Sequence, residues 1–124
     1  MKYLALLLLV PALLAGCATT SDLPPEDQAV MRYDSLSLDG RLALLEVNRA
    51  DSGDLIRTQV LVQNRSAFAL SYQYKFRWYD RNGFEIAPDG EPWQPRRLAG
   101  RSEERLQGVA PNPSAVRFEI WVRE

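Results

Sequence analysis

Few side chains in this 124-residue chain are suited to catalysis. Histidine is absent and cysteine occurs once, so a Ser or Cys nucleophile has no histidine base to activate it. Carboxylates form three close pairs, namely Asp51 with Asp54, Asp80 with Glu85, and Glu103 with Glu104. The first pair lacks the flanking pattern of a calcium loop, the second is expected to cap a turn, and the third points to opposite faces of a strand. We therefore expect no catalytic residue, no metal site and no cofactor.

The single cysteine, Cys17, is instead placed for covalent modification. The charged start at Lys2 is followed by thirteen uncharged, mainly apolar residues, 3–15. This segment is shorter than the ~20 residues of a membrane-spanning helix and matches the apolar region of a secretory signal. It ends in Leu14-Ala15-Gly16-Cys17, which resembles the bacterial lipobox. That resemblance implies cleavage before Cys17 and three acyl chains on it, enough for stable membrane anchoring. An ordinary signal peptide with a chance thiol is the alternative.

The residue after the cysteine, Ala18, favours the outer membrane of a Gram-negative bacterium, because an aspartate there marks retention in the inner membrane. We expect residues 1–16 to be a cleaved signal peptide, residues 17–28 to be the lipidated cysteine and a flexible tether, and residues 29–124 to be the folded domain. The tether is rich in Thr, Ser, Pro and acids, as extended linkers are. Its eleven residues after the cysteine reach at most about 40 Å, so the domain is expected close to the periplasmic face of the membrane.

The folded domain is organised around residues 70–79. Its aromatic side chains fall at every second position, namely Tyr72, Tyr74, Phe76 and Trp78. Polar residues lie between them, and this period of two indicates a strand with one buried face. The dipeptide Asn82-Gly83 then supplies a hairpin turn, and residues 84–87 are expected to return as the partner strand.

Other segments alternate in the same way. We expect strands at residues 41–48, 56–63, 104–110 and 116–123. The polar run 49–54 and the prolines of 88–95 are expected to interrupt strands, with a brief extension at 97–99. Residues 29–33 suit either a short edge strand or one helical turn. Six or seven short strands at these spacings predict an all-β, Ig-like antiparallel β-sandwich of about seven strands.

One surface feature suggests protein binding. Trp93 lies close in sequence to Arg96 and Arg97, a composition typical of protein contacts. The alternative for Trp93 is that its ring closes the open end of the sandwich.

A second surface feature is the polar side of the 70–79 strand. Lys75, Arg77 and Tyr79 share this side, and Arg57 joins them if its strand is adjacent. We expect a solvated sheet face here. The net charge of −1 gives no electrostatic reason to expect nucleic acid as a partner.

Three features together resemble a known family. These are the lipobox, the run Tyr-x-Phe-x-Trp-Tyr-Asp-x-x-Gly at residues 74–83, and the run Arg-Phe-Glu-Ile-Trp-Val at residues 117–122. With them the chain resembles the YcfL family of small periplasmic lipoproteins of Gram-negative bacteria. The resemblance implies an Ig-like sandwich and supplies no catalytic residues. Members are often encoded near a lipoprotein that activates a peptidoglycan synthase, which implies a role in the cell envelope.

The sequence therefore predicts a non-catalytic lipoprotein on the periplasmic face of the outer membrane. It is expected to bind an envelope protein, with a link to peptidoglycan synthesis implied by the resemblance alone. The alternative is a module that binds a small ligand or a glycan such as peptidoglycan through Trp93 and the arginines near it.

Overall fold

Eight strands and two short helices are formed by residues 23–124, which are the residues that the computed structural model describes. The elements in chain order are α1 (Pro25–Gln28), β1 (Met31–Tyr33), the 3-10 helix η1 (Leu36–Leu38), β2 (Leu42–Ser52), β3 (Leu55–Asn64), β4 (Leu70–Tyr79), β5 (Glu85–Ile86), β6 (Gln94–Leu98), β7 (Glu103–Val109) and β8 (Arg117–Arg123). The predicted signal peptide, Cys17 and Ala18 lie outside the described residues.

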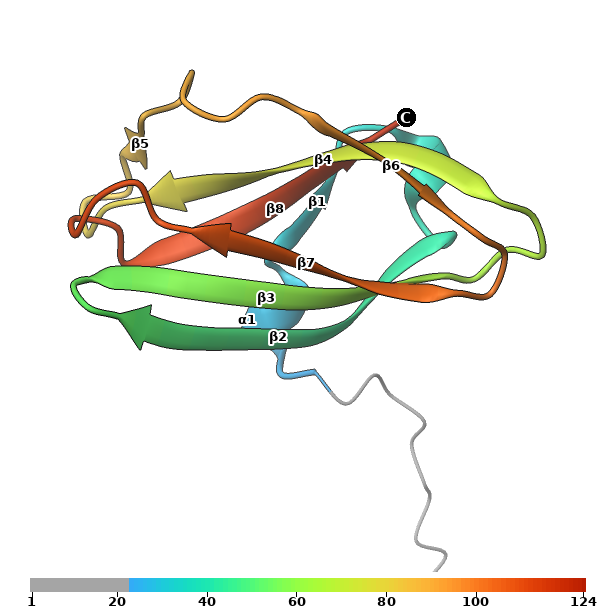
Figure 1. Ribbon diagram of the computed structural model, residues 1–124, viewed down its shortest axis with the longest axis horizontal. Coiled ribbons are helices and arrows are strands. Elements are labelled where there is room, and N and C mark those ends of the chain that lie inside the picture. The colour runs from blue at the N-terminus through green and yellow to red at the C-terminus, as the bar shows by residue number, and fades with distance from the viewer. Residues whose placement is uncertain (1–22) are drawn as a thin grey trace, which may run out of the picture.

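The strands form two facing sheets (Figure 1). Sheet A has the order β1-β8-β4-β5, with β6 also paired to β4, and sheet B has the order β2-β3-β7. All pairs are antiparallel except β1 with β8, which is parallel. The predicted all-β sandwich is confirmed. It has eight strands instead of about seven, and the parallel pair was not predicted.

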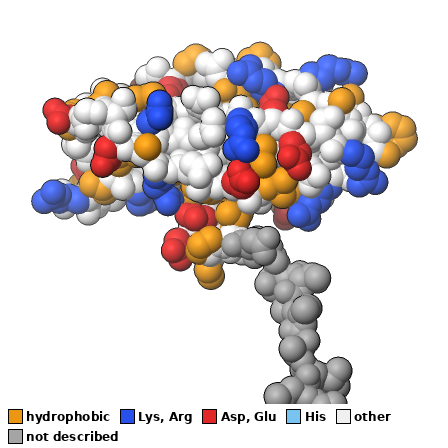
Figure 2. Space-filling view, turned by 60° about the horizontal axis from the view of Figure 1, so that its bottom comes forward, with side chains coloured by type: hydrophobic (Ala, Val, Ile, Leu, Met, Phe, Trp, Pro, Cys, Tyr) orange, Lys and Arg blue, Asp and Glu red, His pale blue; other side chains and the backbone are white. Residues whose placement is uncertain are grey.

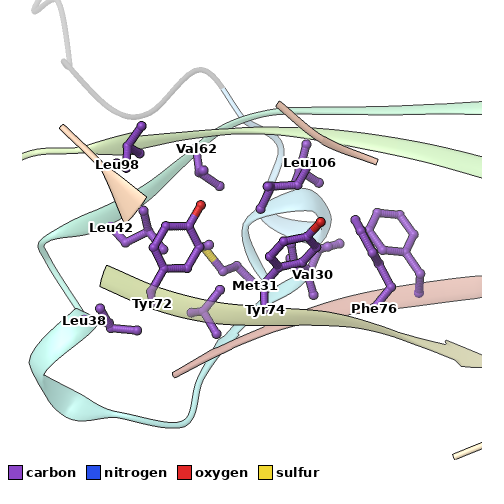
Figure 3. Close-up of a cluster of buried hydrophobic side chains, with 14 of the residues drawn as sticks. Val30, Met31, Leu38, Leu42, Val62, Tyr72, Tyr74, Phe76, Leu98 and Leu106 are labelled. Atoms are coloured by element: carbon purple, nitrogen blue, oxygen red, sulfur yellow. The ribbon is translucent and has the colours of Figure 1, made fainter. Parts of the chain in front are cut away.

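The aromatic side of β4 faces the space between the sheets, as its alternation predicted. Its four rings are buried, and the Trp78 side chain is only 2% exposed. The rings meet aliphatic side chains of sheet B, including Val62 and Leu106 (Figure 3). The ring centroids of Trp78 and Phe118 lie 5.8 Å apart, which joins β4 to its neighbour β8 within the same core. Burial of this stripe is therefore the main apolar contribution of sheet A to folding.

The N-terminal segment closes one side of the sandwich. Val30 and Met31 are buried in the common core. The Ile120 N–H donates to the Val30 carbonyl oxygen at 2.9 Å. The hydroxyl of Tyr33 donates to the carbonyl oxygen of Leu42, at the start of β2, at 2.6 Å. Of the two alternatives for residues 29–33, the short edge strand is confirmed, and it bridges sheet A to sheet B.

The end of the predicted tether is helical. Helix α1 has Pro25 at its start, where a fixed φ and a missing N–H are both tolerated. The N–H groups of Asp27 and Gln28 both donate to the Pro24 carbonyl oxygen. The prediction of an extended chain is wrong for residues 25–28, because a proline that ends one structure can also begin a helix.

Strand β2 continues through part of the polar run that was expected to end it. It pairs with β3 as far as Ser52 opposite Leu55, which leaves a two-residue turn of Gly53 and Asp54. Gly53 has φ +63°, a conformation that glycine adopts without steric cost and that two-residue hairpins require. The prediction of an interruption across residues 49–54 is wrong because β2 is an edge strand whose second half is exposed, where polar residues carry little penalty.

Strand β6 begins inside the proline-rich segment that was expected to be irregular. Gln94–Leu98 pairs with β4 even though it contains Pro95. Proline is tolerated because β6 lies at a sheet edge. Every second backbone N–H of an edge strand points away from the neighbouring strand and needs no partner within the sheet. Phe84 and Val116 fall in the strands predicted at residues 84–87 and 116–123, but each lies just before its strand begins. Their side chains are 71% and 50% exposed.

The edge strands carry charged side chains that point between the sheets. In β2 Arg49 pairs opposite buried Thr58, and in β7 Glu104 accepts a hydrogen bond from the Tyr72 hydroxyl. In β6 Arg96 pairs opposite Tyr72. Strand β2 also has a register shift between Leu44 and Glu46. Inward charges and bulges disfavour pairing with another sheet, so these edges are protected against aggregation.

Candidate binding face

The outer side of sheet A gathers cations and aromatic rings, and we call it the basic face. Alternation along β4 and β8 turns every second side chain outward, and the register places Trp121 opposite Lys75 and Glu119 opposite Arg77. Its six cations are Arg32, Lys75, Arg77, Arg97, Arg117 and Arg123. Its aromatic residues are Tyr79, Trp93 and Trp121, and its carboxylates are Glu85 and Glu119.

The centre of the basic face is the indole of Trp121. The guanidinium carbon of Arg77 lies 4.2 Å from the ring centroid, and that of Arg32, on β1, lies 5.8 Å away. Both are within the range of a cation–π attraction. Trp121 was not singled out from the sequence. The available indication was its position in the final strand, where it is a large aromatic ring on the polar side.

Trp93 lies at the side of the same face. The guanidinium carbon of Arg123 lies 4.0 Å from its ring centroid, and the Lys75 ammonium nitrogen lies 5.1 Å away. The alternative that Trp93 closes the open end of the sandwich is therefore wrong. The loop residue packs instead over β4 and β8, and its ring is half-buried there.

The structure separates the three residues that were predicted to act together. Arg97 shares the outer side of sheet A with Trp93, and its Nη1 lies 3.5 Å from the Ser71 hydroxyl. Arg96 points the other way, toward the core side of the edge, and donates to the Tyr74 hydroxyl at 3.3 Å. Neighbouring residues of a strand face opposite sides, so Arg96 cannot belong to the same surface. Arg57 lies on β3 of sheet B and is not adjacent to the basic face.

Two buried hydrogen-bond donors of the basic face lack acceptors. Arg77 Nε and Trp121 Nε1 are buried and have no hydrogen-bond partner among the described residues. Glu85 lies 3.8 Å from Arg77 Nε, which is an ion pair beyond hydrogen-bonding distance. Burial, followed by the negative charge of Glu119, raises the pKa of Tyr79, so its hydroxyl keeps its proton. The face is therefore rich in donors and poor in acceptors.

A cavity of about 70 Å³ lies beside this face, under the connection between β5 and β6. Glu91 lines it, and its carboxylate accepts the Phe76 N–H at 3.1 Å. That N–H lies where β4 is paired by neither β5 nor β6. Burial raises the pKa of Glu91, and the hydrogen bond from Phe76 opposes this shift. The Glu91 carboxylate thus supplies the hydrogen-bond acceptor that neither β5 nor β6 provides for this N–H.

Two of the three carboxylate pairs are placed as the sequence predicted. Asp80 accepts the N–H groups of Asn82 and Phe84 and so caps its turn. Glu103 is exposed, whereas its neighbour Glu104 accepts a hydrogen bond from Tyr72 on the inner side of β7.

Within residues 23–124, no three His, Cys, Asp or Glu side chains are grouped to hold a metal ion. In the same residues, no helix has the length and apolarity needed to cross a membrane.

Residues 28–124 match the family DUF1425, which is described as a protein of unknown function. The chain belongs to this family. Membership in DUF1425 is consistent with the YcfL resemblance. The matched residues contain every strand and the whole basic face, from Arg32 to Arg123.

Two solved structures are similar to this DUF1425 protein. A DUF1425 family member from Shewanella sp. Pv-4 is 30% identical, with a TM-score of 0.62 over 67% of this chain and 77% of that one. The Campylobacter jejuni protein cj0090 is 22% identical, with a TM-score of 0.63 over 77% of this chain and 98% of that one. The second likeness shows the fold alone. No curated protein matches the chain.

Proposed function

We propose that this DUF1425 protein is a non-catalytic lipoprotein of the outer membrane whose sandwich binds a protein of the cell envelope. Lipid on Cys17 would hold it at the periplasmic face. The lipobox supports the anchor, and the basic face supports the binding. The observation that carries the binding proposal is that five cations lie over three aromatic rings on one side of one sheet.

The composition of the basic face is that of protein contact sites. Trp, Tyr and Arg dominate the residues whose loss weakens protein complexes most. Here Trp93 and Trp121 are fixed by the sheet and by guanidinium groups at 4.0 and 4.2 Å. Side chains that are already ordered lose little rotamer freedom on binding, which favours affinity.

The N-terminal segment leaves the basic face open to a partner. Helix α1 lies at the edge of the sandwich, where Asp27 pairs with Arg49 of β2 at 3.1 Å. Glu26 lines a hollow together with Arg32 and Arg117, at one side of the basic face. Trp93 and Arg123 do not line this hollow, so the segment reaches only that side of the face.

Glycan binding receives less support. A sugar stacks on an aromatic ring through its flat face, and in Trp93 and Trp121 a guanidinium group already lies over the ring. Co-sedimentation of the protein with purified peptidoglycan that is lost in Trp93→Ala would favour this alternative over a protein partner.

The anchor is tested by replacing its cysteine. Cys17→Ser is expected to abolish incorporation of labelled palmitate and to release the protein from the outer-membrane fraction. Persistence of the label or of membrane attachment in Cys17→Ser would contradict the lipid anchor.

The binding surface is tested by photo-crosslinking in living cells. A photo-reactive amino acid at exposed Ser71 lies on the outer side of sheet A, and one at exposed Gln107 lies on the outer side of sheet B. A discrete crosslink to one envelope protein is expected from Ser71 and not from Gln107. No crosslink from Ser71, or the same crosslink from both positions, would contradict the proposal.

A further inference from the structure

We infer that the partner presents an acidic protein surface, rich in carboxylates, to the basic face. This inference rests on the proposed function and adds the chemistry of the partner. The cation excess is local, because the whole chain has 15 basic and 16 acidic side chains. On the outer side of sheet A, six cations face only two carboxylates, Glu85 and Glu119.

The two carboxylates are already engaged by cations of this array. Glu119 lies 3.4 Å from Arg117 and 4.0 Å from Arg32, and Glu85 lies 3.8 Å from Arg77. Within the described part of the chain, no carboxylate lies within ion-pair distance of the three remaining cations, Lys75, Arg97 and Arg123. These three mark the half of the face nearest Trp93. Glu91, beside the face, acts on Lys75 electrostatically but lies beyond ion-pair distance.

The side-chain ends of the remaining cations indicate the same chemistry. The Lys75 ammonium and the Arg97 and Arg123 guanidinium groups offer N–H donors and no acceptor. A carboxylate accepts several hydrogen bonds and donates none, and it pairs with guanidinium groups in two parallel bonds. A surface of Asp and Glu side chains therefore complements both the charge and the donors of these three cations.

An anionic membrane fits the same charge but not the distribution of apolar side chains. Elements that bind a membrane surface carry exposed apolar residues beside their cations. The exposed large hydrophobic residues among residues 23–124 lie in connections between strands or at the end of β7, and not on the strands of the basic face; they are Leu36, Phe68, Phe84, Val109 and Val116. This distribution favours an acidic protein over a lipid surface.

The test uses the mature lipidated protein in neutral detergent, with poly-L-glutamate as a defined acidic probe and tryptophan fluorescence as the readout. Poly-L-glutamate is expected to change the emission of Trp93 and Trp121, with affinity falling as salt rises. Lys75→Gln with Arg123→Gln is expected to weaken binding roughly tenfold, whereas Arg57→Gln with Arg105→Gln, on sheet B, leaves it unchanged. Circular dichroism checks that each variant is folded.

Three outcomes would overturn the inference. These are no binding of poly-L-glutamate, equal weakening by the sheet B variants, and binding of phosphatidylglycerol vesicles through Lys75 and Arg123. The proposed function is judged separately, by the crosslink from Ser71. If that crosslink forms and is unaffected by Lys75→Gln with Arg123→Gln, protein binding stands and the acidic partner is wrong. If the wild-type chain gives no crosslink, the proposed function itself fails.

Discussion

The outer faces of the two sheets differ although the sheets share one core. On sheet B the row across the strands consists of the amides Asn48, Gln59 and Gln107, and Arg105 is paired with Glu46 at 3.0 Å. The side of the molecule that carries β2 shows acidic and basic side chains intermixed (Figure 2). Sheet A instead collects cations and aromatic rings. Folding requires only that outward residues tolerate water, so the bias of the basic face is not explained by folding and supports the proposed binding role.

The largest effect on stability is expected when a substitution on the inner side of sheet A is compared with one on its outer side. Trp78→Ala should lower the free energy of unfolding by about 3–5 kcal/mol, because it removes a fully buried indole from between the sheets. Trp121→Ala, on the outer side of the same sheet, should cost much less. Urea unfolding of both variants measures the difference. Equal losses would show that the outer face is as structural as the core.

The second comparison lies within one strand of sheet B. Asn64 is fully buried, and its amide donates to the carbonyl oxygens of Phe68 and Leu98 at 2.8 and 3.1 Å. Asn64→Ala should destabilise the protein by about 2–3 kcal/mol because buried carbonyls lose their donors. Its neighbour Gln63 points outward, and Gln63→Ala should change stability by less than about 0.5 kcal/mol. Thermal unfolding of both variants tests the contrast, which a similar shift in Tm would refute.

A smaller effect is expected where the two outer faces are compared directly. Arg77→Gln removes a cation from the Trp121 ring and should cost about 0.5–1 kcal/mol. Arg105→Gln breaks an exposed ion pair with Glu46 on sheet B and should cost less than about 0.5 kcal/mol. Chemical denaturation of the two variants measures both values. A larger loss of stability in Arg105→Gln than in Arg77→Gln would mean that the cation–π contacts do not stabilise the basic face.

The smallest effect concerns pH and the half-buried carboxylate beside the basic face. Burial raises the pKa of Glu91 above its ordinary value of 4.5, so its protonated form favours the folded state. This contribution is fully present below pH 4.5 and is lost as pH rises through the raised pKa. Glu91→Gln keeps an acceptor for the Phe76 N–H and should lack this loss. Tm values measured from pH 4 to pH 7 test it, and parallel pH profiles of variant and wild type would contradict it.

The sequence was most informative about the interior and least informative about the edges. The alternation in residues 70–79 predicted β4 and its buried side because a one-residue shift would expose every ring. The polar end of β2 and Pro95 in β6 were misread, since edge strands accept residues that central strands exclude. The structure places Trp93 and Arg97 on one surface and Arg96 on the other. This separation was not predicted, because alternation had not been applied to a segment expected to be irregular.

The basic face itself could be predicted only in part. Lys75, Arg77 and Tyr79 were recognised as one side of a strand, but no prediction placed Trp121 and Arg123 on the same surface. What brings them together is the register of β4 with β8, which pairs Lys75 with Trp121. Register between strands distant in sequence depends on the packing of the whole core, so a single sequence does not reveal it.

The measurement that tests this account most directly is the response of the three indole N–H signals in NMR spectra to poly-L-glutamate. Trp93 and Trp121 lie on the basic face, and Trp78 lies in the core of the same sheet. We predict that the Trp93 and Trp121 signals shift on addition of the probe, while Trp78 and the side-chain amides of Gln59 and Gln107 do not. Shifts in the sheet B amides without shifts at Trp93 and Trp121 would contradict the claim that binding belongs to the outer side of sheet A.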